Sequence, residues 1–76
     1  MDSYGEILKE ARETKNLDFD TVSRETSINR AFIEGLENED DSAFPGEPYM
    51  VGFLRNYSDY LGTNTDSLLQ LFRNKK

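Results

Sequence analysis

The chain has 76 residues, with nine Lys and Arg against 15 Asp and Glu, so its formal net charge at pH 7 is −6. This length allows one small domain, and the acidic balance opposes capture of nucleic acid or anionic lipid. Because the chain has no cysteine and no histidine, it lacks the commonest metal ligands and the commonest general base. No apolar run approaches the roughly 20 residues that a membrane span needs. We therefore expect one soluble domain with no catalytic, cofactor or metal site.

The first part of the chain predicts two short helices. Ser3 and Glu6 have the spacing of a capping box, which opens a first helix over residues 4–15. Asp18 is the expected N-cap of a second helix that ends near Thr26. The polar face of the first helix is expected to consist of Glu6, Lys9, Arg12 and Glu13.

A third helix follows after a three-residue break and completes a helix-turn-helix. Asn29 is its expected N-cap, and it runs to about Asn38. In DNA-binding proteins of this shape, the third helix reads bases in the major groove. Its apolar residues are Phe32, Ile33 and Leu36, and its expected exposed residues are Asn29, Arg30, Glu34 and Glu37.

An acidic stretch surrounds the end of the third helix and argues against DNA. Between residues 34 and 47 there are six carboxylates and no basic residue, which would oppose the phosphate contacts that supply most affinity. We interpret Glu37, Glu39, Asp40 and Asp41 as a solvated charge run rather than a cation site. We retain a repressor-like, sequence-specific DNA-binding domain as the alternative function. The six residues are Glu34, Glu37, Glu39, Asp40, Asp41 and Glu47.

The second part of the chain predicts a loop and two more helices. Residues 44–47 read Phe-Pro-Gly-Glu, which favours a type II turn, and Phe44 is expected to insert into the core. A fourth helix is predicted over 48–61 with a stop at Gly62, and Thr63 with Asp66 predicts the capping box of a fifth. Leu68, Leu69, Leu71 and Phe72 would close the core.

Taken together, these elements predict an all-α fold, a compact five-helix bundle that contains a phage-repressor-like helix-turn-helix. Residues 1–76 form a single domain, ordered over about 4–73 with a tail at 74–76.

Aromatic residues recur along the fourth helix. Met50, Leu54, Tyr57 and Leu61 fall within one narrow stripe, the expected core seam. Tyr49, Phe53 and Tyr60 fall to one side of this seam, next to Asn56, at the margin between core and solvent. Two interpretations stay open: these rings fill the core under the loop, or they form a contact ridge framed by Arg55 and Asn56.

Five segments of the chain resemble one family of bacterial proteins. They lie at residues 5–12, 22–28, 32–37, 44–49 and 52–62, and the most specific is a Pro-Gly turn followed by a helix with Gly-Phe-Leu-Arg at 52–55. Together they closely resemble the N-terminal cytoplasmic domain of the RodZ family of cell-shape proteins.

This resemblance implies a partner and a cellular place. RodZ-like proteins cross the inner membrane once, and their cytoplasmic domain binds the actin-like filament protein MreB, largely through the fourth helix. The chain would then be a fragment from the cytoplasmic side, monomeric when isolated, that links MreB to the membrane-bound wall-synthesis machinery. The predicted partner-binding residues are Tyr49, Phe53, Arg55, Asn56, Tyr57 and Tyr60.

Overall fold

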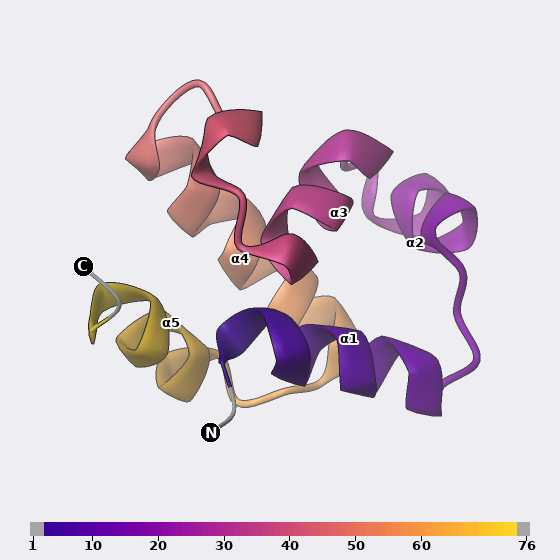
Figure 1. The fold of residues 1–76 in the computed structure, drawn as a ribbon. Helices are drawn as coiled ribbons and strands as arrows, with labels where there is room; N and C mark the ends of the chain where they lie inside the picture. Colours follow the sequence, from indigo (N-terminus) through magenta and orange to yellow (C-terminus); the bar gives the residue numbers. More distant parts are fainter. Residues whose placement is uncertain (1–2, 75–76) are drawn as a thin grey trace.

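Five α-helices and one short 3-10 helix make up the fold (Figure 1). The computed structural model describes residues 3–74, and no strand occurs within that range. The all-α, five-helix prediction is therefore confirmed. The elements are α1 (Tyr4–Thr14), α2 (Phe19–Thr26), α3 (Arg30–Asn38), η1 (Asp41–Ala43), α4 (Glu47–Leu61) and α5 (Thr65–Asn74).

Side-chain caps set where the first three helices begin. The Ser3 hydroxyl accepts the Glu6 N–H at 3.3 Å, and the Asp18 carboxylate accepts the Thr21 N–H at 2.7 Å. Asn29 caps α3 by accepting the Ala31 N–H at 2.8 Å. Each bond satisfies a backbone donor that the first turn leaves without a partner. The predicted starts of α1, α2 and α3 are confirmed.

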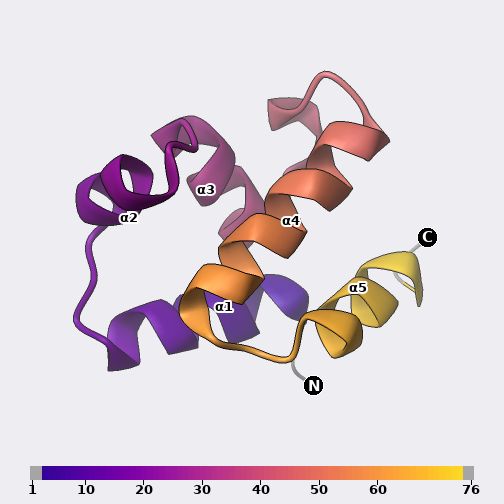
Figure 2. The ribbon, with the colours of Figure 1, turned by 180° about the vertical axis from the view of Figure 1, so that it is seen from behind.

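Helix α4 is the centre of the bundle. It packs against α1, α2, α3 and α5, and the reverse view shows it crossing in front of the other helices (Figure 2). The predicted seam of Met50, Leu54, Tyr57 and Leu61 is buried. Phe44 is also buried, so the loop before α4 does insert its ring into the core, as predicted.

The loop and the last two helix starts differ from the prediction. Gly46 has φ 178°, an extended conformation, so the predicted type II turn at residues 44–47 is wrong. The extended backbone places Phe44 in the core, and α4 begins at Glu47 with Pro48 in its first turn.

The fifth helix starts later than predicted, at Thr65. Its first turn is capped by Asn64, whose side-chain oxygen accepts the Ser67 N–H at 3.0 Å. Thr63 is not the cap because its hydroxyl lies 2.6 Å from that of the buried Ser58. Helix α5 includes Asn74, so the predicted tail does not begin there, and the rest of that tail lies outside the described residues.

The start of α1 approaches the end of α3 very closely at Gly5. A Cβ at this position would lie 2.3 Å from the carbonyl oxygen of Glu37, so no larger residue fits without moving a helix. The Gly5 N–H also donates to the Glu39 carboxylate at 3.1 Å. Glycine at this position therefore lets the two helices meet.

Candidate partner-binding surface

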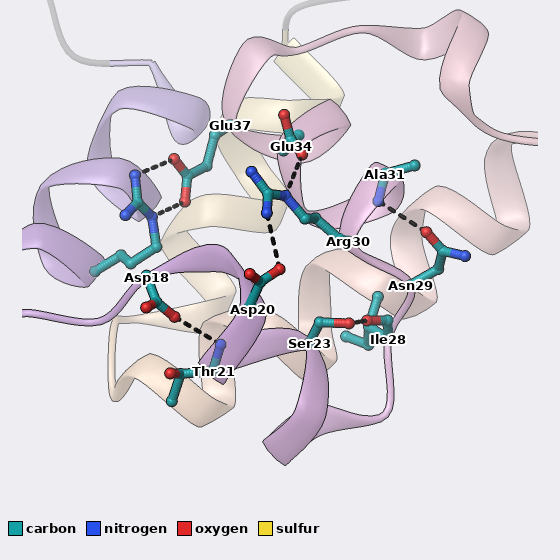
Figure 3. Close-up of polar contacts among 11 residues, drawn as sticks. Asp18, Asp20, Thr21, Ser23, Ile28, Asn29, Arg30, Ala31, Glu34 and Glu37 are labelled. Carbon is teal, nitrogen blue, oxygen red and sulfur yellow. Dashed lines mark hydrogen bonds and ion pairs between the residues drawn. The ribbon is translucent and has the colours of Figure 1, made fainter.

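Arg30, at the start of α3 in the helix-turn-helix, lies among carboxylates. The Arg30 guanidinium lies 2.8 Å from Glu34 on the same helix and 2.8 Å from Asp20 on α2 (Figure 3). Hydrogen bonds to Glu34 and Asp20 raise the pKa of Arg30 above its ordinary value. The group is exposed, so the pairs contribute little to stability. They engage the Nε and Nη1 atoms of Arg30 and place two carboxylates beside its guanidinium.

A buried polar network joins α1, α3 and α4. Arg12 donates two hydrogen bonds to the Glu37 carboxylate, at 2.7 Å and 3.1 Å, and a third to the Leu17 carbonyl at 2.9 Å. The Tyr57 hydroxyl donates to the same carboxylate. The side chains of Arg12 and Glu37 are only 11% and 3% exposed.

This network overturns two expectations from the sequence. Arg12 was expected on the polar face of the first helix, and Glu37 on the exposed face of the third. Both side chains point inward because the guanidinium and the carboxylate form a bidentate pair between α1 and α3. Burial, followed by the hydrogen bond to Glu37, raises the pKa of Tyr57, which keeps the phenol protonated as the donor.

The acidic stretch is largely engaged within the domain. Glu34 pairs with Arg30, and Glu37 belongs to the buried network. Glu39 accepts a backbone N–H at the start of α1, and Asp40 accepts the N–H of Ser42 at the start of η1. The interpretation as a solvated charge run is therefore wrong for Glu37 and Glu39, which contact α1, whereas Asp40 is exposed.

One side of α4 carries the aromatic residues predicted at its margin. Tyr49 is 58% exposed, and no other large apolar side chain within residues 3–74 is classed as exposed. Phe53 is partly buried and stacks on Phe32 of α3, with ring centroids 4.7 Å apart and planes 18° apart. Tyr60 is partly buried, and its hydroxyl donates to the Glu25 carboxylate of α2.

The structure separates the six predicted contact residues into three groups. Tyr57 is fully buried and belongs to the core, as the predicted seam of α4 indicated. By helical spacing, Tyr49, Phe53, Asn56 and Tyr60 share one stripe, whereas Arg55 lies roughly 130° away around the helix. Asn56 and Arg55 are both exposed. For all six residues, contact with a partner stays a prediction.

Two residues near this stripe were not predicted from the sequence to belong to a surface. Phe32 was predicted only as a core residue, yet its ring lies between those of Phe44 and Phe53, with centroids at 5.3 Å and 4.7 Å. Gly52 lies exposed on α4 with nothing within 4 Å of an added Cβ. A glycine inside a helical pattern lowers helix stability, so its position in the sequence is visible as an exception to that pattern. Among residues 3–74, no group of three or more Asp and Glu side chains is arranged to hold a metal ion.

The helical fold and the capped helices α2 and α3 define a helix-turn-helix domain. Comparison with protein families agrees, because residues 7–68 match the family described as "Helix-turn-helix domain". The chain therefore belongs to this family. No curated protein and no solved structure matches it. Within the described helices, none has the length and apolar character to cross a membrane.

Proposed function

We propose that this domain is a non-catalytic adaptor that binds the filament protein MreB and links it to the membrane-bound cell-shape and wall-synthesis machinery. The partner's identity comes from the likeness to RodZ-type domains. The observation that carries the proposal is the 58% exposed ring of Tyr49 at the head of an aromatic stripe on α4. On this proposal the full-length protein crosses the inner membrane once, and this domain lies on the cytoplasmic side.

The rings on α4 are suited to a protein contact because they are already ordered. Phe53 is held by stacking on Phe32, and Tyr60 by its hydrogen bond to Glu25. A side chain that is fixed before binding loses less conformational entropy when a partner covers it. Aromatic residues also supply much of the binding energy in protein interfaces. The stripe therefore offers apolar area at a low ordering cost.

The charges of the helix-turn-helix favour a protein partner over DNA. Arg30 would have to leave both Asp20 and Glu34 to reach a phosphate, and those carboxylates would then face the backbone of the duplex. The chain also carries a formal net charge of −6. Neutralisation of phosphates supplies most non-specific DNA affinity, and here the net charge has the wrong sign.

The expected contact area is small, so tight attachment requires many copies bound along one filament. One helix of a 76-residue domain offers less area than a standard protein interface, which implies weak binding by a single copy. Many copies tethered to one membrane and facing one filament would raise occupancy through effective concentration. The isolated domain is expected to be monomeric and to bind filaments weakly.

Co-sedimentation with polymerised MreB tests the proposal. The domain is expected in the pellet with filaments, and Tyr49→Ala is expected to lower its affinity by about 1 to 3 kcal/mol if the ring is a hot spot. Because Tyr49 is mostly exposed, the variant should keep its thermal melting transition. A fluorescent DNA duplex serves as the second arm. Salt-sensitive duplex binding that is lost in Arg30→Ala, together with no pelleting, would replace the adaptor with the DNA-binding alternative.

A further inference from the structure

Gly52 is the one glycine within a helix for which the domain itself gives no reason. An added Cβ would lie 2.3 Å from a carbonyl oxygen at Gly5 and 2.9 Å from the Ala43 Cβ at Gly35. Gly62 has φ +76°, which side chains rarely adopt. At Gly52, by contrast, the helical backbone is ordinary and an added Cβ would meet nothing within 4 Å.

A glycine in the middle of a helix lowers the stability of that helix. It loses more backbone entropy on folding than alanine and, apart from proline, is the least favourable residue in a helix interior. Since the 15-residue helix α4 is the centre of the bundle, a glycine in it weakens the element on which the fold depends. No contact inside residues 3–74 offsets that loss at Gly52. A contact outside the chain would.

The neighbours of Gly52 on the helix surface surround a piece of backbone that no side chain covers. We call this surface the seat. On any α-helix the residues three and four positions away are the surface neighbours. Here these are Pro48 and Tyr49 before the glycine, and Arg55 and Asn56 after it, and all four are exposed. In the reverse view no other helix lies in front of α4 (Figure 2). Gly52 itself is exposed, so its backbone is approachable from outside.

Arg55 adds a charge to this seat. The ion pairs found between described residues involve Arg12 and Arg30 but not Arg55. An exposed guanidinium outside those ion pairs, on a chain whose net charge is −6, is available for a carboxylate on another molecule. A basic side chain of the partner at this position would be repelled by Arg55.

We propose that the filament partner makes its closest approach to α4 at Gly52, where a bulky apolar side chain of the partner seats on the bare backbone between Tyr49 and Arg55. A partner carboxylate one turn away pairs with Arg55. This inference rests on the proposed function. It makes Gly52 a determinant of partner specificity, because any side chain at this position would hold the partner away from the backbone.

The test compares stability and filament binding in Gly52→Ala and Gly52→Leu. Because alanine and leucine favour helices and the space is empty, both variants are expected to melt several degrees higher than the parent chain. Affinity for polymerised MreB is expected to fall about tenfold for Gly52→Ala and further for Gly52→Leu, since a methyl group is already costly in a close-packed contact. Arg55→Glu is expected to lower affinity without a change in melting temperature.

A matched variant separates stabilisation from loss of contact. Ser67→Ala raises helix propensity at an exposed position of α5, away from the seat, and should leave filament binding unchanged. If Gly52→Ala binds filaments as tightly as the parent chain, or melts at a lower temperature, the inference is overturned while the adaptor proposal stands. If the parent chain itself does not pellet with filaments, the adaptor proposal fails, and the inference fails with it.

Discussion

Replacing Glu37 with Gln should be among the most damaging single-atom changes in this domain. The substitution keeps the shape of the side chain but removes the charge that compensates Arg12, whose side chain is only 11% exposed. The Tyr57 hydroxyl loses its ionised acceptor in the same step. Arg12 would remain charged inside the protein because a guanidinium does not lose its proton.

The magnitude follows from the burial of the pair. Removing one partner of a buried ion pair costs about 3 to 5 kcal/mol. Arg12 keeps its bond to the Leu17 carbonyl and its position over the Phe19 ring, 4.1 Å from the ring centroid, which softens the loss. We expect Glu37→Gln to lower the free energy of unfolding by about 2 to 3 kcal/mol, which for a small domain lowers the melting temperature by roughly 10 to 20 °C.

Urea and thermal unfolding followed by circular dichroism measure this loss. Glu34→Gln is the matched control because it removes one carboxylate from the exposed pair with Arg30, where we expect less than about 1 kcal/mol. If the two variants lose the same small free energy, the buried network does not hold α1, α3 and α4 together as described.

Two further predictions concern the same core. Burial is the main reason that the pKa values of Tyr4 and Tyr57 are raised, so above about pH 10 the folded state keeps protons that the unfolded chain releases. Stability should be insensitive to these groups below that pH and should fall above it by up to about 1.4 kcal/mol per pH unit for each tyrosine; a urea midpoint unchanged from pH 9 to 11 would contradict this. Gly5→Ala should lower the free energy of unfolding by at least about 1 to 3 kcal/mol, because its Cβ meets a carbonyl oxygen at 2.3 Å, and a melting temperature equal to that of the parent would refute the close approach.

Local patterns predicted most of the fold. Caps at Ser3, Asp18 and Asn29 and the apolar seam of α4 are properties of a few neighbouring residues, and the structure has them where the spacing indicated. One error arose where a residue had two possible partners. Thr63 has the spacing of an N-cap, but its hydroxyl is taken by Ser58, so the cap moves to Asn64.

The candidate site was less accessible to sequence reasoning because it depends on contacts between distant segments. Periodicity placed Tyr49, Phe53 and Tyr60 at the edge of the core, but it gave no means of seeing that Phe53 stacks on Phe32 of α3. Glu37 was predicted to be a surface carboxylate because its neighbours in the sequence do not indicate a partner. That partner, Arg12, lies 25 positions earlier in the chain. The complete burial of Tyr57 confirms its place in the core seam, whereas its contact with a partner stays a prediction.

A binding curve for this domain on polymerised MreB tests whether the side of α4 that carries Tyr49 binds a filament. The proposal predicts saturable co-sedimentation that weakens in Tyr49→Ala, while Ser67→Ala on α5 binds like the parent chain. Equal binding by Tyr49→Ala and the parent, with both variants folded, would contradict the claim that this side of α4 is the contact. Absence of the parent chain from the filament pellet would contradict the adaptor function itself.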